Sequence, residues 1–594
     1  MHNGDLSIFP LQQSFPSALP HPVFIMTSLG PIFADDLARV KPGDRLRLTI
    51  SAQTSDAAAL AQAALEARAR GERVLVVCAD PADVPRLAQE MPWFEPKLDV
   101  RPLPDWETLP YDVLSPQEEL VSERLEALYR LTAPTGGADV LLTSAVTASQ
   151  RLSPVSYIGA NTFFFHQGEQ ISLTTLQKRL AAAGYANVKQ VLAAGEFAVR
   201  GSIVDVFPMG SERPFRLDFF DDEIESIRWF DVDTQRSMES AEEIRLLPGH
   251  EFPVDPEALL AFRQRWRREF AGDPKKSIVY CDIEKEILPP GIEYYLPLFF
   301  DETAALTDYL PLNARVFLLG DIEAALQAFG RDMASRYKVL AADPQRPALA
   351  PERIWLKPEE FFKSLANFAR FTVEKKENAE DLKRLSGIEV DRKSQNPVGK
   401  LLERTRESAM KGVRTLIAAP SAGRMETMSQ LLRTGGLSVE EFPDWQTFLE
   451  ADSALGIAAA PLFSGAVFHH PEIVILSEAE LYAASPRRHR LRRVKHATTL
   501  EMMVRDVAEL KPGDAVVHAD HGIGRYQGLV HMETPDGDAE FLEITYKNDA
   551  KLFVPITNLQ LISRYAGADP EHAPLHQLGR GDWEKAKRKA AHSS

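Results

Sequence analysis

The amino-acid sequence predicts a multidomain α/β protein that contains a parallel sheet. Its 594 residues correspond to about four domains at the usual size of roughly 150 residues each. Apolar runs at Arg73–Cys78 (RVLVVC) and Asp139–Ser144 (DVLLTS) are typical of buried strands. Helical stretches separate them, and the alanine-rich stretch Asp56–Arg70 ends at Gly71. Strands that alternate with helices in this way favour a parallel, doubly wound sheet.

Three further patterns follow along the chain. Ser202–Phe207 (SIVDVF) and Phe215–Phe220 (FRLDFF) alternate as strands of a small α+β insertion. The strand-like run Thr415–Ala419 opens a second small α/β domain. Beyond it, Gly513–Ile562 is β-rich, with glycines at 513, 522, 524 and 528. Glycines punctuating short strands suit the tight turns of a small SH3-like or Tudor-like β-barrel.

These patterns divide the chain into consecutive segments. They are a flexible leader (1–39), the first part of the α/β domain (40–160), the α+β insertion (161–246), the second part of the α/β domain (247–371), a charge-dense linker or exposed helix (372–396), the small α/β domain (397–484), a basic linker (485–502), the β-rich module (503–577) and the start of a helix (578–594). Residues 6–34 carry no charge, but five prolines interrupt them and no basic segment precedes them. We therefore expect a surface leader and no membrane span.

Composition restricts the class of protein. With only Cys78 and Cys281, the chain has neither a disulfide framework nor a cysteine-based zinc site, and this usage fits the cytoplasm. The net charge of −17 argues against broad coating of DNA or of an anionic membrane. One basic tract, Arg487–Lys495, is equally compatible with a solvated linker and with a nucleic-acid contact. We expect weak or indirect DNA binding and a monomer.

A nucleotide site is not expected. A P-loop needs glycines and a lysine to cradle phosphate, whereas the strand-to-helix turn at Thr49–Asp56 reads TISAQTSD. The parallel sheet is therefore predicted to be of a P-loop type whose phosphate site has degenerated, with no catalytic residue and no cofactor. His518, Asp520 and His521 are too few to indicate a metal site.

Five motifs carry a resemblance to a known family. They are Asp105–Asp112 (DWETLPYD), Ser115–Leu125 (SPQEELVSERL), Gly195–Gly201 (GEFAVRG), Arg213–Ile224 (RPFRLDFFDDEI) and Val517–Tyr526 (VHADHGIGRY). In order and spacing they resemble the transcription-repair coupling factors, over about residues 40–591. The resemblance covers only the half of those proteins that precedes the ATP-driven motor, and Lys585–Ala591 matches the start of the helix that leads into it.

The resemblance implies a partner for the insertion. The first domains are similar to the damage-recognition protein UvrB, and the insertion of that family binds UvrA through positions that match Arg200, Arg216 and Phe220. Independently of the family, Arg216 and Phe220 lie four apart on one strand and so face the same side. From the residues alone, the alternative is that Phe220 packs in the core and that Arg216 pairs with Asp218 or Asp222.

The chain departs from UvrB itself in two ways. UvrB has an intact P-loop and a tyrosine-rich hairpin that clamps damaged DNA. Here the P-loop is absent, and only about a dozen residues separate Tyr111 from Glu123, too few for such a hairpin. We expect this half to imitate UvrB toward UvrA without binding ATP or clamping DNA.

The β-rich module resembles the CarD-type RNA-polymerase-interaction domain. The resemblance implies that one strand edge docks on the β subunit of RNA polymerase, and edge pairing would supply main-chain hydrogen bonds. The candidate contacts are Arg525, Tyr526, Leu529 and Met532. The alternative is that Leu529 and Met532 fill the core of the barrel.

Taken together, the sequence predicts an adaptor for transcription-coupled nucleotide excision repair that recognises stalled polymerase and recruits UvrA. The full-length family uses ATP and Mg²⁺, but this chain lacks both Walker motifs and is not expected to be an enzyme on its own. Two alternatives stay open: a DNA translocase whose motor is supplied elsewhere, and a CarD-like transcription regulator.

Overall fold

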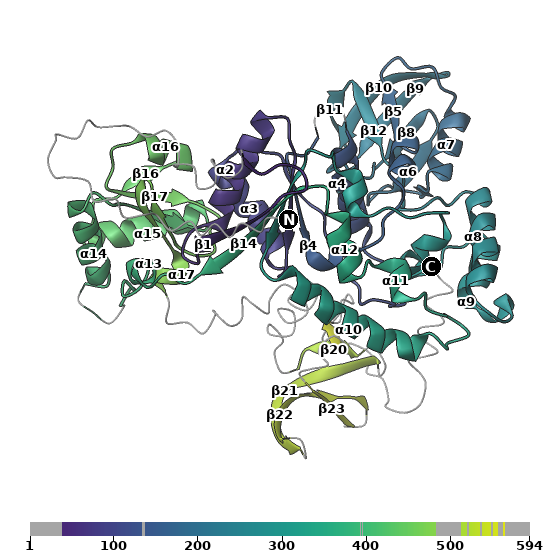
Figure 1. Ribbon diagram of the computed structural model, residues 1–594. Coiled ribbons are helices and arrows are strands. Elements are labelled where there is room, and N and C mark those ends of the chain that lie inside the picture. The colour runs from purple at the N-terminus through teal and green to yellow at the C-terminus, as the bar shows by residue number, and fades with distance from the viewer. Residues whose placement is uncertain are drawn as a thin grey trace. The chain divides into compact units, whose positions relative to one another are not determined.

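The computed structural model describes residues 39–133, 137–391, 394, 396–482, 513–518, 522–534, 537–547, 550–555 and 562–564. The chain forms two compact units, residues 1–484 and 485–594, and each is described by itself (Figure 1). Within the described ranges, no helix is both long and apolar enough to cross a bilayer.

A six-stranded parallel sheet forms the centre of the first unit. Its strands in spatial order are β1 (Arg45–Ser51), β14 (Ala369–Lys376), β13 (Arg315–Leu319), β2 (Val74–Cys78), β4 (Val140–Ser144) and β3 (Val100–Pro102). Every neighbouring pair runs parallel. Strands β2, β4 and β13 are buried along their whole length, as expected for a parallel sheet with both faces covered. The predicted parallel sheet is confirmed.

Helices connect these strands, and most of them pack on the sheet, whereas the helices at 256–269, 278–284 and 351–354 pack in a separate aromatic cluster. The longer ones are α2 (Asp56–Ala69), α3 (Asp83–Phe94), α4 (Glu118–Thr132), α8 (Pro256–Glu269) and α10 (Ile322–Leu340), and the shorter ones are α5 (Ala145–Ser149), α6 (Val155–Ala160), α9 (Ile278–Glu284), α11 (Pro351–Ile354) and α12 (Pro358–Ser364). Three 3₁₀ turns lie at Pro274–Lys276, Ile292–Leu298 and Leu306–Tyr309. Helix α2 begins after Ser55, whose hydroxyl oxygen accepts a hydrogen bond from the backbone N–H of Ala58 at 3.2 Å.

The charge-dense segment 372–396 is more ordered than a linker. Strand β14 continues through it to Lys376, and the short helix α13 (Ala379–Arg384) follows. Val373 is buried and pairs with Leu48 of β1, so the strand stays in the sheet although charged residues flank it. Ala369, Phe371 and Val373 of β14 are buried, and these three apolar residues hold the strand in the sheet although its last residues are charged.

The insertion forms a second sheet. Its order is β11 (Ser237–Ala241), β10 (Glu223–Phe230), β9 (Phe215–Phe220), β8 (Ile203–Val206), β7 (Glu196–Arg200) and β6 (Ala186–Asn187). Strands β5 (Phe163–His166) and β12 (Glu243–Leu246) pair separately, and helix α7 (Leu173–Ala182) lies between β5 and β6 in the chain. The two strands predicted for this region correspond to β8 and β9. Leu176, Leu180, Val204 and Leu217 belong to one buried apolar cluster on the inner side.

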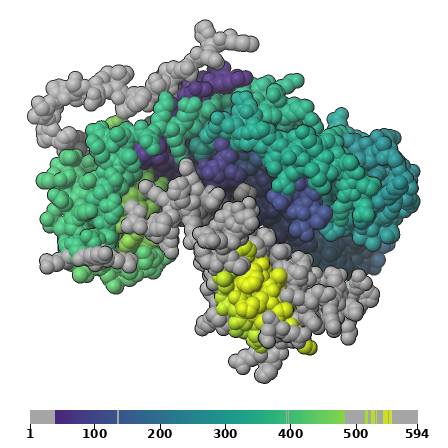
Figure 2. All heavy atoms as spheres, turned by 90° about the horizontal axis from the view of Figure 1, so that it is seen from below, coloured from purple at the N-terminus to yellow at the C-terminus, as the bar shows by residue number. Residues whose placement is uncertain are grey.

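The small α/β domain follows. Its sheet order is β16 (Glu440–Phe442), β17 (Leu455–Ala459), β15 (Arg414–Ala419), β19 (Glu472–Ser477) and β18 (Ala466–His469), with helices α14 (Gly399–Met410), α15 (Ala422–Thr434), α16 (Trp445–Glu450) and α17 (Glu478–Leu481). Trp445 and Phe468 share one buried cluster with Leu60 of α2 and Met91 of α3. The green residues of this domain lie against the purple residues near the start of the described chain (Figure 2).

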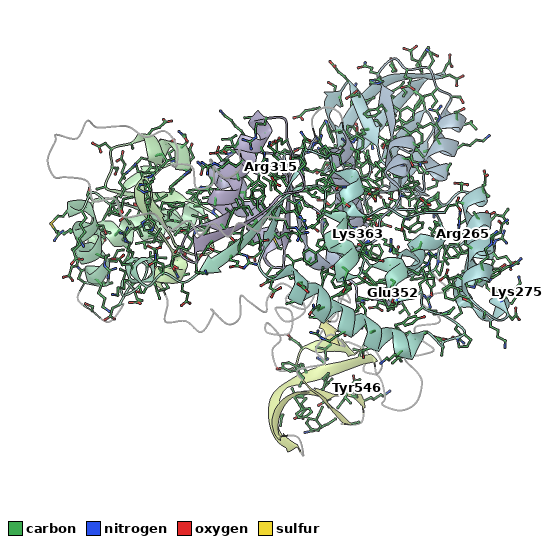
Figure 3. All side chains as sticks on the ribbon, viewed as in Figure 1. Arg265, Lys275, Arg315, Glu352, Lys363 and Tyr546 are labelled. Atoms are coloured by element: carbon green, nitrogen blue, oxygen red, sulfur yellow. The ribbon has the colours of Figure 1, made fainter. Side chains whose placement is uncertain are left out.

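The second unit contains a five-stranded antiparallel sheet. Its order is β23 (Lys551–Pro555), β22 (Gly537–Thr545), β21 (Gly522–Thr534), β20 (Ala515–His518) and β24 (Ile562–Arg564). Val516, Leu542, Ile544 and Tyr546 form its buried cluster, and Tyr546 is labelled in Figure 3.

The glycines of this unit do not all mark turns, contrary to expectation. Gly524 and Gly528 lie inside one long strand, β21, of which Gly522 is the first residue. A Cβ at Gly524 would come within 2.5 Å of Ile544 Cγ2, so glycine is needed there for close packing. Gly528 has a φ of 137° at the point where the pairing of β21 with β22 shifts register, which is the position of a β-bulge.

Candidate partner-docking surfaces

The structure brings Arg200 and Phe220 to one end of the insertion sheet. Strands β7 and β9 both run antiparallel to β8, which lies between them, and so they run in the same direction. Arg200 is the last residue of β7 and pairs with Ile203 across a two-residue turn. Phe220 is the last residue of β9 and pairs with Glu223 across a second two-residue turn. The two side chains therefore stand at the same end of the sheet.

The alternation of β9 assigns its side chains to two faces. Phe215, Leu217 and Phe219 are buried, whereas Arg216, Asp218 and Phe220 are on the opposite face. Phe220 is 70% exposed. The structure thus contradicts the alternative in which Phe220 packs in the core.

Arg216 pairs with a residue that the sequence did not indicate. Its Nε donates to Asp205 Oδ1 at 2.6 Å and its Nη2 donates to Asp205 Oδ2 at 3.0 Å. The hydrogen bonds to this carboxylate raise the pKa of Arg216. The alternative partners Asp218 and Asp222 are therefore wrong, because strand register places Asp205 of β8 directly opposite Arg216.

Asp205 was missed although the sequence held a signal for it. It stands between Val204 and Val206 in a strand and is 1% exposed, and aspartate is depleted in strands. A carboxylate in such a position calls for a cationic partner. Arg200 is the second cation beside it, because its Nη2 lies 3.6 Å from Asp205 Oδ2 while its side chain is 49% exposed.

Strand β21 of the second unit carries the four candidates for polymerase contact. Arg525 Nη1 donates to the carbonyl oxygen of Gly513 at 2.8 Å. Tyr526 is 7% exposed and belongs to the apolar cluster of the sheet. The backbones of Leu529 and Met532 pair with Leu542 and Ala539 of β22. The surroundings of the Leu529 and Met532 side chains lie outside the described residues.

The turn from β1 into α2 is lined by charge rather than by glycine. Asp56 lies in the first turn of α2 and is 3% exposed. Arg86 and Lys375 form ion pairs with its carboxylate, at 2.8 Å and 2.6 Å. The adjoining cavity measures about 130 Å³, and Glu90 and Gly465 also line it. At this turn the carboxylate of Asp56 is neutralised by Arg86 and Lys375, which are cations of the chain itself.

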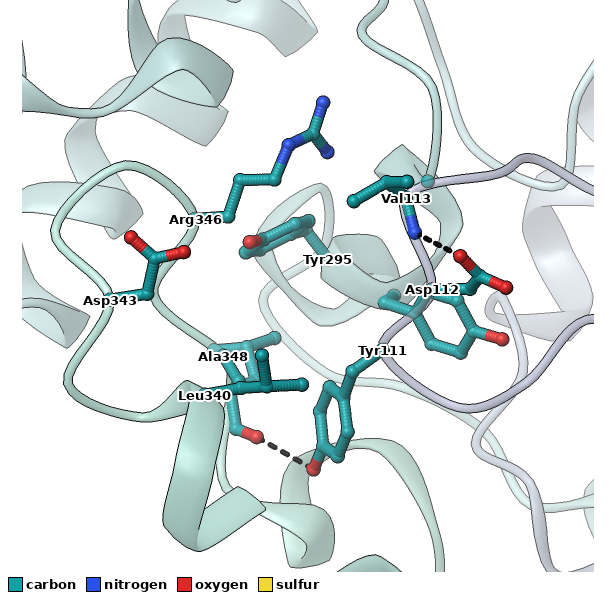
Figure 4. Close-up of a pocket in the computed structure, with 11 residues that line it drawn as sticks. Tyr111, Asp112, Val113, Tyr295, Leu340, Asp343, Arg346 and Ala348 are labelled. Atoms are coloured by element: carbon teal, nitrogen blue, oxygen red, sulfur yellow. Dashed lines mark hydrogen bonds between the residues drawn. The ribbon is translucent and has the colours of Figure 1, made fainter. Parts of the chain in front are cut away.

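A second, smaller cavity lies beside the loop that carries the DWETLPYD motif (Figure 4). It measures about 70 Å³ and is lined by Tyr111, Tyr295, Leu340 and Arg346, among others. That volume holds a few waters. The hydroxyl of Tyr111 donates to the carbonyl oxygen of Leu349 at 2.9 Å, so this tyrosine anchors the loop by its tip.

Comparison with known proteins identifies three segments. The family model of the UvrB interaction domain matches residues 163–252, the model of the MFD D3 domain matches residues 409–481, and the model of the CarD-like/TRCF RID domain matches residues 510–566. The first matched segment contains Arg200, Arg216 and Phe220, and the third contains all of β21.

Whole-chain relatives agree with these matches. The transcription-repair-coupling factor of Escherichia coli (strain K12) is 38% identical over 528 residues, which are 87% of this chain and 45% of that protein. The same-named protein of Haemophilus influenzae is 38% identical over 504 residues, 83% of this chain and 43% of its own length, and that of Bacillus subtilis (strain 168) is 25% identical over 514 residues, 79% and 41%. The chain spans slightly less than half the length of these curated relatives. It belongs to the family of transcription-repair-coupling factors, of which it carries the part that contains the three matched domains.

Proposed function

We propose that the chain is an adaptor in transcription-coupled nucleotide excision repair. It binds UvrA through the outer face of the insertion sheet and the β subunit of RNA polymerase through β21, and it does not hydrolyse ATP by itself. The adaptor works as a monomer in the cytoplasm, where Cys78 and Cys281 remain free thiols.

The observation that carries the UvrA half of the proposal is the end of the insertion sheet at which β7 and β9 terminate. An aromatic ring that is 70% exposed stands at the same end of the sheet as a half-exposed arginine two strands away. Aromatic and arginine side chains dominate the energy of protein interfaces. The exposed ring and the exposed arginine at this end of the sheet are the residue types that suit docking of a partner.

The polymerase half is supported by the pairing of β21. Strand β20 pairs with β21 from Gly522 to Arg525, while β22 pairs with it from Arg525 to Thr534. Among the described residues, the side of β21 opposite β22 has no strand partner beyond Tyr526. An open edge offers backbone N–H and C=O groups to a partner strand. We propose that these strands close into an SH3-like or Tudor-like barrel and that Arg525, Leu529 and Met532 flank the docking edge.

The turn between β1 and α2 supports the statement on ATP. We infer that the parallel sheet is a degenerate P-loop fold in which Asp56 takes the place of bound phosphate. Its carboxylate lies at the start of α2, where a helix attracts anions, and Arg86 and Lys375 already neutralise it.

Binding of the purified chain to UvrA tests the first half. Phe220→Ala is expected to weaken binding at least tenfold, because an exposed anchor at an interface centre is worth more than 1 kcal/mol. Phe164→Ala is the matched control, since Phe164 is a 45% exposed phenylalanine on β5 of the same insertion. Equal affinity of both variants and the wild-type chain would contradict the proposal.

Binding to RNA polymerase tests the second half. Met532→Arg is expected to abolish polymerase binding while UvrA binding stays at its wild-type value, because the two surfaces lie on separate units. Glu533→Arg introduces the same side chain at the next position of β21 and is the matched control. Polymerase binding that survives Met532→Arg would rule out this edge.

A further inference from the structure

We infer that Arg216 does not contact UvrA and is instead a positioning residue, which together with Asp205 holds the surface from which Arg200 and Phe220 contact the partner. The inference rests on the proposed function, since it divides one docking surface into contact and positioning residues. The partner must then offer an apolar recess for the Phe220 ring and a carboxylate for Arg200.

The hydrogen bonds of Arg216 are made within the insertion. Besides the two to Asp205, its Nη1 donates to the carbonyl oxygen of Gln235 at 3.1 Å and to Ser237 Oγ at 3.2 Å. A guanidinium has five N–H groups, and these contacts occupy most of them. The guanidinium carbon also lies 4.9 Å from the ring centroid of Phe230. The Arg216 side chain is only 18% exposed, so a partner would have to break existing bonds to reach it.

Asp205 explains why Arg216 must stay in place. Its side chain is 2% exposed, and a buried carboxylate without a cation is strongly destabilising. The bidentate bond to Arg216 fixes the plane of this carboxylate. Asp205 Oδ2, which accepts from Arg216, also faces Arg200 Nη2. One buried carboxylate therefore holds one arginine inside the domain and steadies the other at the surface.

The remaining two side chains are suited to reach a partner. Arg200 and Phe220 lie two strands apart, which is roughly 10 Å at the usual spacing between strands. Both stand immediately before a hairpin turn, where the sheet ends and a partner meets no neighbouring strand. Phe220 contributes apolar area to this surface, and Arg200 contributes a cation. Ile203 and Asp218 lie between them on the same face, because Arg200 pairs with Ile203 and Ile203 pairs with Asp218.

The positioning role predicts a rescue that a contact role does not. Arg216→Gln leaves Asp205 buried without its main cation, so both the unfolding midpoint and the affinity for UvrA should fall. Asp205→Asn combined with Arg216→Gln replaces the ion pair by a neutral amide pair. If Arg216 only positions the surface, this double variant regains the midpoint and binds UvrA within about tenfold of the wild-type chain.

A matched control separates charge from position. Arg228 of β10 is the register neighbour of Arg216 on the same face and is exposed. Arg228→Gln removes the same charge from the same face, and we expect an unchanged unfolding midpoint and an affinity within about threefold of wild type.

The experiment measures UvrA affinity and urea unfolding for Arg200→Ala, Phe220→Ala, Arg216→Gln, Arg228→Gln and the double variant, all in the full chain. Loss of affinity in Arg216→Gln with an unchanged midpoint would overturn the inference. A double variant that regains its midpoint but binds as weakly as Arg216→Gln would overturn it as well. If Arg216→Gln does not fold, the double variant alone decides in the same way.

Failure of the proposed function gives a different result. In that case Arg200→Ala and Phe220→Ala bind UvrA as tightly as the wild-type chain. If only the inference fails, those two variants remain defective and the double variant joins them.

Discussion

The carboxylate of Asp56 accepts two hydrogen bonds from the guanidinium of Arg86, 2.9 Å at Oδ1 and 2.8 Å at Oδ2. Burial alone would raise the pKa of Asp56, but Arg86 and Lys375 hold it well below its usual range. The carboxylate is therefore a permanent anion at the start of α2. Since a helix start accommodates one anion well, a phosphate would have to displace it.

The first prediction concerns nucleotide binding, which the pair of Asp56 and Arg86 should prevent. We expect millimolar Mg²⁺–ATP to leave the thermal unfolding midpoint of the chain unchanged, because ligand binding to the folded state alone would raise it. An intact P-loop ATPase in the same buffer is the positive control. A rise that depends on ATP concentration would refute our interpretation of the β1–α2 turn.

A second prediction concerns Arg124 of α4, whose side chain is fully buried. Its Nε donates to Glu251 Oε1 at 2.5 Å, and Trp106 Nε1 donates to Glu251 Oε2 at 3.3 Å. Arg124→Met is expected to lower the free energy of unfolding by about 3–5 kcal/mol, since it leaves a buried carboxylate without its cation.

The control for Arg124 is Arg101→Met. Arg101 and its partner Asp99 are 38% and 30% exposed, and exposed ion pairs contribute about 0–1 kcal/mol. Urea denaturation of both variants measures the difference, and equal effects would show that burial does not decide the cost.

The third prediction is a pH dependence that centres on Glu293. Burial raises the pKa of Glu293 to about 7, from 4.5 in an unperturbed chain. The folded protein thus keeps a proton that the unfolded chain releases, so this contribution to stability is complete below pH 4.5 and is lost as the pH rises through 7. The loss amounts to about 3.5 kcal/mol at most, because the pKa rises from 4.5 to about 7 and each pKa unit corresponds to about 1.4 kcal/mol.

Glu293→Gln should remove that dependence. The amide oxygen can still accept the hydrogen bond that Ser115 Oγ donates at 2.8 Å. We expect the variant to gain stability relative to wild type between pH 5 and pH 8, as measured by urea denaturation at both values. Glu302→Gln, at an exposed position, should show no such difference. If the difference in unfolding free energy between the variant and the wild-type chain is the same at pH 8 as at pH 5, the assignment to Glu293 is wrong.

The fourth prediction concerns close packing at Gly524. An added Cβ would meet Ile544 Cγ2 at 2.5 Å and Tyr546 Cζ at 3.1 Å. Gly524→Ala is therefore expected to destabilise the antiparallel sheet by about 1–3 kcal/mol and to weaken polymerase binding. Hydrogen exchange read by mass spectrometry should show faster exchange in β21 and β22 alone.

Gly423→Ala is the comparison for Gly524. A Cβ at Gly423 meets nothing within 4 Å, and alanine is a better helix former than glycine. We expect exchange in its helix, α15, to stay the same or to slow. Faster exchange in both variants would mean that close packing at Gly524 is not the cause of the destabilisation.

Local patterns were sufficient for elements whose burial follows from their own residues. The run at Val74–Cys78 is apolar throughout and became a central strand, and the alternation of Phe215–Phe220 gave both a strand and its two faces. The end of β14 was missed because charged residues dominate it, and only pairing with β1, more than 300 residues away, keeps it in the sheet.

The sequence predicted which face of a strand a side chain lies on better than it predicted the partner of that side chain. The sequence placed Arg216 and Phe220 on one face, but it could not supply Asp205, because a cross-strand partner depends on the register of two strands. Tyr526 was a candidate contact only because of the resemblance to the CarD-type domain, and in the structure its side chain is 7% exposed and belongs to the cluster around Ile544. Such choices depend on which face of a sheet is covered, and that is a property of the whole unit.

The cluster in which Trp445 and Phe468 meet α2 and α3 determines how the first unit comes apart. Trp93 adds to this contact, because its Nε1 donates to the carbonyl oxygen of Ala459 at 3.2 Å and its ring lies 5.6 Å from that of Trp445. Neither sheet can lose its fold without exposing this aromatic surface to water. The parallel sheet and the small α/β domain should therefore melt as one cooperative foldon, and proteolytic nicking between them would leave two pieces that stay associated.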